Sequence, residues 1–178
     1  MGKVRHVLGI SGGKDSAALA IYMKQNYPDL DIEYYTSDTG KELQDTYDLI
    51  ENLESFLGKE IIKLPALSDD TLNPFDHYIK MYNGFLPGSM SRWCTKKLKL
   101  EPFEKFVGDD LVISYVGIRG DEDREGYISK KSNIQSIFPF RKNMFSEDVT
   151  AKFLSNSNIN NVLKYYEILD LGEKKERI

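Results

Sequence analysis

Cysteine is scarce in this sequence. The 178 residues include one, Cys94, so the chain cannot form an internal disulfide. A single thiol also cannot supply the four ligands of an iron–sulfur cluster, and we expect no such cluster in one chain. The two histidines, His6 and His77, stand apart from one another and from Cys94, so the sequence shows no cluster of metal ligands.

Long apolar runs are also missing. No stretch approaches the roughly 20 residues that span a bilayer, and the first residues show no signal-peptide pattern. We therefore expect a cytoplasmic protein that does not bind membranes. The net charge of −4 gives no global sign of nucleic-acid binding, although cations cluster between Arg92 and Lys99. With 40% apolar and 29% charged residues, the chain should fold as one domain of ordinary size.

Strand-like and helix-like segments alternate along the chain. β-branched and apolar runs predict strands at 4–10, 32–36, 61–64, 111–117 and 134–138. Apolar residues at helical spacing predict a helix after each of the first two strands, with Leu43 on the second helix and Gly58 at its end. The pattern predicts further helices near 75–82, from Thr95 and near 162–171, with Ser146 as a helix N-cap. This alternation indicates a three-layer α/β/α fold around a mostly parallel sheet.

The segment Ser11-Gly12-Gly13-Lys14-Asp15-Ser16 lies where the first strand meets the first helix. Its glycines free backbone N–H groups to line a concavity at the positive end of a helix. Lys14 can reach bound oxyanions, and the serine hydroxyls can donate hydrogen bonds. The segment therefore favours a pyrophosphate group, with an ordinary glycine turn as the alternative. Its spacing fits neither the Walker A loop nor the dinucleotide-binding loop.

Polar residues follow two further strands. Asp38, Thr39 and Gly40 come after the second strand, where ligands bind in open α/β sheets; a helix N-cap by Asp38 or Thr39 is the alternative. Gly117, Arg119, Asp121 and Arg124 come after the fourth strand. The two arginines are candidates for oxyanion contacts, and Asp121 could orient them or help to hold Mg²⁺. A charged surface loop is the competing interpretation.

A cationic segment lies between these strands. Arg92 offers a planar fork for phosphate or sulfate, and the helix from Thr95 should direct cations such as Lys99 toward the cleft. Cys94 is equally compatible with a buried structural role. The aromatic residues Tyr34, Tyr35, Tyr78 and Tyr82 could stack on a base, although core packing is the simpler interpretation.

Together these motifs resemble the phosphoadenosine phosphosulfate reductase family of the PP-loop ATP pyrophosphatase superfamily. The resemblance rests on SGGKDS at 11–16, DTGKE at 38–42, RWCTKKLK at 92–99 and GIRGDEDR at 117–124, with a weaker likeness at 138–149. The WCTxxLK form is most similar to the ATP pyrophosphatase subunit of DNA phosphorothioation. The resemblance implies an adenine nucleotide alpha-hydrolase-like (HUP-type) fold, a PP-loop nucleotide-binding domain at 1–155 and a helical extension of that domain at 156–178.

The resemblance also implies site residues and cofactors. ATP and Mg²⁺ are the expected cofactors, with Asp121 as a metal ligand, and Lys14, Asp38, Arg119 and Arg124 as catalytic residues. The implied nucleotide-binding residues are Ser11, Gly12, Gly13, Lys14, Asp15, Ser16, Asp38, Thr39, Gly40, Arg92, Cys94, Lys99, Gly117 and Arg119.

Three functions remain open at this stage. Sulfonucleotide reductases of the family carry a catalytic cysteine in a C-terminal E-C-G-x-H segment, which these 178 residues lack. We therefore favour cleavage of ATP between its α and β phosphates to adenylate an acceptor, for sulfur transfer or nucleic-acid modification. A reductase-like protein and a non-catalytic nucleotide-binding subunit are the alternatives. A partner protein that supplies sulfur or acceptor specificity, a nucleic acid and a homodimer are compatible with each.

Overall fold

The computed structural model describes residues 4–69, 71–123, 129 and 131–142. Several sequence predictions lie outside these residues: Arg124, the N-cap at Ser146, the helix near 162–171 and the domain boundary at 155. They stay predictions. No helix in the described part of the chain is long and apolar enough to cross a membrane.

A parallel sheet forms the centre of the molecule. Its strand order is β3-β2-β1-β4-β5, and every neighbouring pair is parallel. The strands are β1 (Arg5–Gly9), β2 (Ile32–Ser37), β3 (Ile61–Leu64), β4 (Val112–Tyr115) and β5 (Ile134–Ile137). All five lie within the predicted runs or within a residue of them. The predicted α/β fold with a mostly parallel sheet is therefore confirmed, and every pairing in the described residues is parallel.

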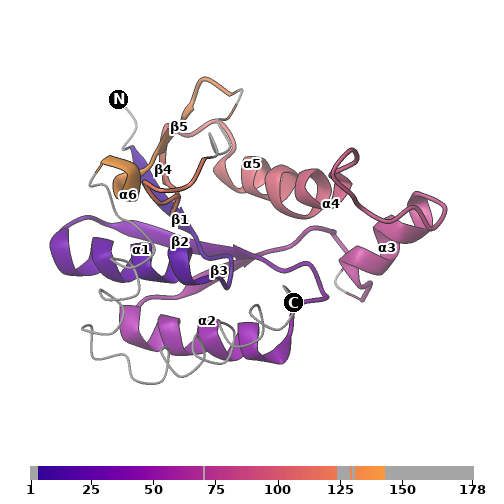
Figure 1. Ribbon diagram of the computed structural model, residues 1–178, viewed down its shortest axis with the longest axis horizontal. Coiled ribbons are helices and arrows are strands. Elements are labelled where there is room, and N and C mark those ends of the chain that lie inside the picture. The colour runs from indigo at the N-terminus through magenta and orange to yellow at the C-terminus, as the bar shows by residue number, and fades with distance from the viewer. Residues whose placement is uncertain (1–3, 70, 124–128, 130, 143–178) are drawn as a thin grey trace.

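Helices cover both faces of this sheet. They are α1 (Lys14–Asn26), α2 (Gln44–Leu57), α3 (Pro74–Met81), α4 (Trp93–Thr95), the π-helical turn η1 (Lys96–Leu100), α5 (Glu101–Val107) and α6 (Pro139–Lys142). Helices α1 and α2 lie together on one side of the sheet, and α5 lies on the other (Figure 1). This arrangement gives the three layers that the sequence predicts.

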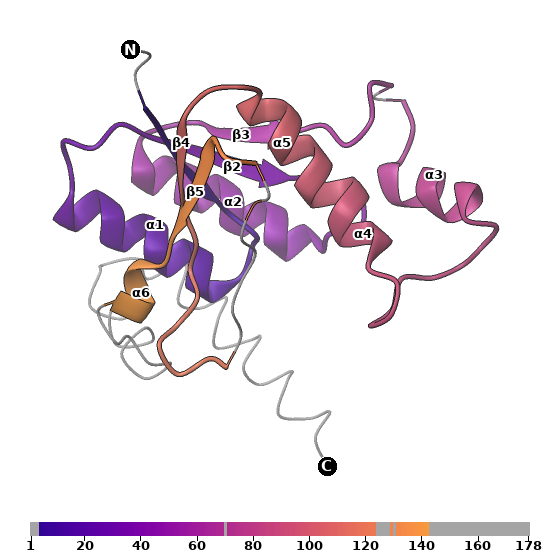
Figure 2. The ribbon, with the colours of Figure 1, turned by 90° about the horizontal axis from the view of Figure 1, so that it is seen from above.

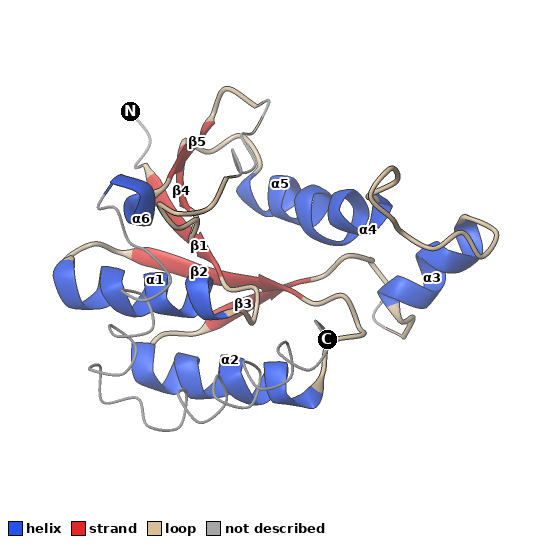
Figure 3. Cartoon of the chain, in the orientation of Figure 1, coloured by secondary structure: helices blue, strands red, loops and turns tan. Residues whose placement is uncertain are grey.

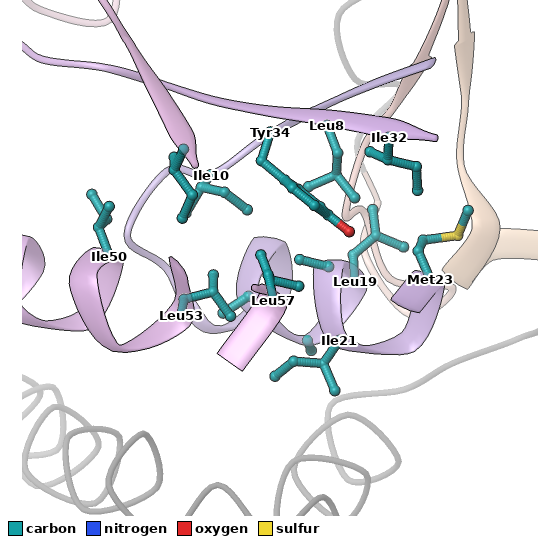
Figure 4. Packing of buried hydrophobic residues seen from close by; sticks show 14 of the residues in the cluster. Leu8, Ile10, Leu19, Ile21, Met23, Ile32, Tyr34, Ile50, Leu53 and Leu57 are labelled. Atoms are coloured by element: carbon teal, nitrogen blue, oxygen red, sulfur yellow. The ribbon is translucent and has the colours of Figure 1, made fainter. Parts of the chain in front are cut away.

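Two apolar cores hold the layers together. In the first, Leu8 and Tyr34 from the strands meet Leu19 of α1 and Leu53 of α2, as Figure 4 shows. The second core lies on the opposite face and joins residues such as Val7 to Phe103 and Val107 of α5. Adjacent residues of β1 thus enter different cores, because successive strand side chains point to opposite faces.

The start of α2 differs from the prediction. Leu43 shares the helical spacing of the apolar face, but it is the N-cap, and its side chain is 67% exposed. Neither Asp38 nor Thr39 caps a helix, because α2 begins at Gln44. The predicted stop at Gly58 is confirmed, since this residue ends α2 in the left-handed conformation at φ 63°.

The segment between β3 and α5 extends away from the sheet. Figures 2 and 3 show α3 at the far end of this arm, apart from the layered body. The side chain of Trp93 is buried in the arm, where Phe75 and Tyr82 contact it with ring centroids 5.5 and 5.3 Å away. The helix predicted from Thr95 begins two residues earlier, at Trp93, and continues through η1 into α5. Tyr78 and Tyr82 thus pack on Trp93.

Candidate functional site

The glycine-rich loop follows the central strand of the sheet. From β1 the chain proceeds to β2 and β3 on one side, and it returns to β4 and β5 on the other. The loop between β1 and α1 therefore lies where the strand order reverses. In open α/β sheets, ligands bind at this point, beyond the carboxyl ends of the strands.

Hydrogen bonds within the loop define its shape. The Ser16 hydroxyl accepts a hydrogen bond from the Ser11 N–H at 3.1 Å and donates one to the Gly13 carbonyl at 3.0 Å. The Ser11 hydroxyl oxygen lies 3.1 Å from the Ser16 hydroxyl oxygen. Ser16 is buried, whereas Ser11 is exposed. Ser16 thus braces the loop from inside, whereas Ser11 lies on its exposed side.

The glycines satisfy two different constraints. Gly12 has φ +77°, and a Cβ at this position would collide with Thr46 Cγ2 of α2. Gly13 is the N-cap of α1, and no side chain caps the helix there. The first N–H groups of α1 therefore stand at an open helix terminus, which favours an anion.

Two adjoining pockets lie at this end of the sheet. The first, of about 240 Å³, passes from the loop to α2, to Lys99 of η1 and over the sheet face beneath α5. The second, of about 230 Å³, lies between the loop and the end of β4. Gly9, Ser11, Tyr35 and Val116 line both pockets. Phosphates at the loop could therefore extend into either pocket.

Tyr35 forms the wall shared by the two pockets. Its ring stacks on Phe103 with centroids 5.0 Å apart, and a Cβ at Gly9 would lie 2.9 Å from the ring. Burial raises the pKa of Tyr35 above its usual range, with an opposing hydrogen bond from Ser114. The phenol is thus a neutral group at neutral pH. Tyr34, in contrast, lies in the core between the sheet and its helices.

Asp38 organises the loop that follows β2. Its Oδ1 accepts hydrogen bonds from the Gly40 N–H at 2.8 Å and from the Tyr47 hydroxyl at 2.9 Å. Burial and, to a smaller extent, the hydrogen bond to Asp38 together raise the pKa of Tyr47 to about 12. Asp38, Tyr47 and Glu42 all line the first pocket, and Glu42 accepts a hydrogen bond from Thr39 at 2.9 Å. Tyr47 and Glu42 are not among the site residues expected from the sequence. Helical spacing identifies Tyr47 as an apolar position, and Glu42 is the last residue of the DTGKE motif, where no role is assigned to it.

Arg119 lies among three carboxylates. Its guanidinium donates to both oxygens of Asp15, at 3.0 and 3.2 Å, and to Asp121 at 3.0 Å, and it lies 3.6 Å from Glu122. Asp121 therefore orients Arg119, one of the two roles that the sequence allows; its metal role stays a prediction. Burial raises the pKa of Asp15, and the charge of Arg119 opposes that rise.

The cationic segment divides between pocket and surface. Lys99 lines the first pocket as predicted. Arg92 is exposed as the N-cap of α4, and the Cys94 thiol is half-buried at 4.0 Å from the Thr95 hydroxyl. Neither Arg92 nor Cys94 is among the described residues that line the two pockets. Arg92, Cys94 and Lys99 come from one short sequence stretch, yet of the three Lys99 alone lines one of the two pockets.

The family model of the phosphoadenosine phosphosulfate reductase domain matches residues 5–166 of the chain. The chain belongs to this family. In this phosphoadenosine phosphosulfate reductase family member, the matched region includes the glycine-rich loop and both of the segments that follow β2 and β4.

Curated relatives match the chain over part of their own length. An uncharacterized protein of Methanocaldococcus jannaschii is 34% identical over 146 residues, 74% of this chain and 28% of that protein. The tRNA-specific 2-thiouridylase of Actinobacillus succinogenes is 23% identical over 172 residues, 78% of this chain and 43% of that enzyme. A nin region protein of Escherichia phage lambda is 28% identical over 145 residues, which cover 67% of this chain and 49% of that protein. The family member thus spans less than half the length of each of these relatives.

Solved structures share the fold. The phosphoadenylyl-sulfate reductase of Candida auris, in a phosphate complex, matches with a TM-score of 0.64 and 18% identity over 96% of this chain and 79% of that chain. The U34-tRNA thiolase of Methanococcus maripaludis, with its [4Fe-4S] cluster, matches with a TM-score of 0.55 and 18% identity over 99% of this chain and 69% of that chain. Both likenesses support the HUP-type α/β fold that the motifs imply.

Proposed function

We propose that this family member binds ATP with Mg²⁺ and cleaves it between the α and β phosphates, so that an acceptor becomes adenylated. The observation that carries the proposal is the SGGKDS loop at the switch point of the sheet, with an open helix terminus and two pockets beside it. A triphosphate needs an anion site for its leaving pyrophosphate and a neighbouring cavity for the nucleoside. The loop and the first pocket offer that combination.

Each part of the site has a role in this reaction. The N–H groups at the start of α1 and Lys14 would hold the β and γ phosphates and stabilise the charge on the departing pyrophosphate. The first pocket would hold the nucleoside between Ile50 of α2 and Phe103 of α5. Such a reaction depends on positioning and on neutralising charge, and it requires no nucleophilic side chain.

The residues in the first pocket fit Mg²⁺. In nucleotide sites this ion is held by one or two carboxylates together with phosphate oxygens. Asp38 and Glu42 both line the pocket, and the hydrogen bonds that Asp38 accepts from Gly40 and Tyr47 both go to Oδ1. These two carboxylates would hold the ion, which when bound would offset the negative charge of the phosphates.

The acceptor is proposed by similarity. The relative from Actinobacillus is named a tRNA-specific 2-thiouridylase, and the Methanococcus structure is of a U34-tRNA thiolase. Adenylation of an oxygen makes it a leaving group that sulfur can displace. We therefore propose sulfur transfer to a nucleic acid, with a partner that supplies the sulfur, as the context of the reaction.

The test uses ATP labelled at the α phosphate. The full chain is incubated with Mg²⁺ and with candidate acceptors such as bulk tRNA, and labelled AMP or adenylated product is scored against ADP. We expect label in AMP or in the acceptor. ADP as the main product would contradict the proposal, because it would place the attack on the γ phosphorus. ATP binding without turnover under any condition would favour the nucleotide-binding subunit.

Sulfonucleotide binding is the second candidate. The family model and the reductase from Candida auris support it. A thermal-shift titration with ATP and with phosphoadenosine phosphosulfate separates the two, because ligand binding to the folded state raises the melting temperature. A much larger shift with the sulfonucleotide would favour the reductase-like function.

A further inference from the structure

A negative charge lies inside the anion pocket. Asp15 is the fifth residue of the SGGKDS loop, and it lines the second pocket together with Ser11, Gly13 and Ser16. Its side chain is 22% exposed to solvent. A bound phosphate would therefore lie near this carboxylate, and like charges at such short range repel strongly where water is partly excluded.

Arg119 neutralises this charge from outside the loop. Its Nη1 contacts both carboxylate oxygens of Asp15, at 3.2 and 3.0 Å, across 104 residues of sequence. The guanidinium is 15% exposed, and Asp121 and Glu122 hold its other side. In this arrangement carboxylates accept hydrogen bonds from its Nε and Nη1, and Arg119 is not among the described residues that line either pocket.

The backbone supports the same contact. Gly117 lies directly beneath the loop, where a Cβ would come within 2.7 Å of the Asp15 carbonyl. The end of β4 is thus in van der Waals contact with the first turn of α1. Arg119 follows two residues later, so the close approach at Gly117 places its side chain against Asp15.

We propose that Arg119 is a positioning residue that prepares the loop for an anion by neutralising Asp15, and that it does not contact the phosphates itself. This inference rests on the loop being the phosphate site of the proposed function, and it does not depend on where ATP is cleaved. It differs from the role that the sequence suggests for Arg119, which is direct contact with an oxyanion.

The test is a double-mutant cycle on anion binding. Four full-length proteins are compared: the parent, Asp15→Asn, Arg119→Met and the double variant. ATP with Mg²⁺ is titrated at pH 7.5 by calorimetry, and inorganic pyrophosphate serves as a second probe. Urea unfolding without ligand shows which variants are folded. Asp110→Asn is a matched control, because it removes an exposed carboxylate that lies 2.9 Å from a different arginine, Arg5.

We expect Arg119→Met alone to weaken binding by about tenfold or more, a size typical of coupled neighbouring charges. Asp15→Asn should bind as well as the parent or better, and it should restore most of the affinity when combined with Arg119→Met. Asp110→Asn should change affinity by less than about threefold, because its ion pair is exposed and Asp110 is not among the described residues that line either pocket. Rescue by Asp15→Asn distinguishes neutralisation from direct contact.

The pH dependence gives an independent readout. Arg119, Lys14 and Glu122 are the charged groups whose fields act on Asp15. Without Arg119 the carboxyl should protonate at a higher pH, so the affinity of Arg119→Met should approach that of the double variant as the pH falls. Comparison with the double variant cancels the titration of ATP itself.

Three outcomes would overturn the proposal. Equal weakening by Arg119→Met in both backgrounds would show that Arg119 contacts the anion directly. Loss of binding in Asp15→Asn alone would show that the carboxylate itself is required, as a cation ligand would be. If the folded parent binds neither probe, the loop is not a phosphate site. If the cycle succeeds and no AMP forms, the reaction fails while the role of Arg119 stands.

Discussion

Gly117 packs directly against the backbone of Asp15: a Cβ at position 117 would lie 2.7 Å from the Asp15 carbonyl oxygen and 3.3 Å from the Ser16 nitrogen. The segment that follows β4 and the start of α1 therefore approach so closely that a residue with a Cβ does not fit at position 117. Two of the six residues in the loop, Asp15 and Ser16, take part in this contact.

Gly117→Ala should destabilise the protein and displace the loop. Overpacking of this kind costs about 1–3 kcal/mol, and the atoms in the way are backbone atoms that cannot rotate aside. We expect a lower urea midpoint and a smaller ATP-induced rise in melting temperature. Gly88→Ala is the control, because no atom lies within 4 Å of its added Cβ and its φ is not positive. Equal behaviour of the two variants would contradict the contact.

Lys14→Ala should remove most of the ATP-induced thermal shift. Lys14 begins α1, and in the proposed function its charge is the cation that the loop contributes to the phosphates. Lys80→Ala, at an exposed position of α3, removes the same charge far from the loop and should leave the shift unchanged. A shift in Lys14→Ala as large as that of the parent would exclude the loop as the phosphate site.

Asn73 should stabilise the contact between the arm and the loop that follows β2. Its Oδ1 accepts a hydrogen bond from the Asp76 N–H at 3.1 Å and caps α3, while its Nδ2 donates to the Gly40 carbonyl at 2.7 Å. Asn73→Ser retains a capping oxygen but loses the donor, whereas Asn73→Ala loses both. We expect losses of about 1 kcal/mol for the serine variant and about 2 kcal/mol for the alanine variant in urea unfolding. Identical unfolding of both variants and the parent would show that neither bond matters.

The stability of the fold should decrease at alkaline pH, in part through Tyr34. Burial raises the pKa of Tyr34 to about 12, from 10 in the unfolded chain. A raised pKa means that the folded state retains the proton more strongly, so the stabilisation is complete below pH 10 and is lost as the pH rises toward 12. Tyr34→Phe has no proton to lose there, so its unfolding free energy should fall less between pH 9 and pH 11.5. Tyr82→Phe, on the exposed arm, should follow the parent, and parallel curves for all three proteins would contradict this assignment.

The sequence predicts much of the fold because its signals there are local. Runs of β-branched and apolar residues mark all five strands, and Gly58 marks the end of α2 through its left-handed conformation. Leu43 shows the limit of such reasoning. Its spacing matches the apolar face of α2, but hydrophobic spacing does not reveal where the helix begins, and the residue lies outside it at 67% exposure.

The candidate site is less predictable because its contacts join distant residues. The residue types and position of Ser11–Ser16 predict a phosphate loop from the sequence alone. The bond from Tyr47 to Asp38 and the ion pair of Arg119 with Asp15 have no signal in the sequence, since each requires the packing of separate elements. Arg92 and Cys94 share a motif with Lys99, but helix geometry turns neighbouring side chains in different directions, and proximity in sequence did not bring all three to the pockets.

The central place of β1 has a consequence for how the site survives fluctuations. Since β1 is the middle strand of the five, with two strands on either side, we expect its amides to belong to the last unit of the sheet to open. The edge strands β3 and β5 each have one neighbour among the described strands, and they can exchange their amide hydrogens through smaller, more frequent openings. The proposed phosphate loop is attached to the strand that we expect to exchange most slowly. Partial unfolding at either edge should thus occur many times while the SGGKDS loop keeps its shape.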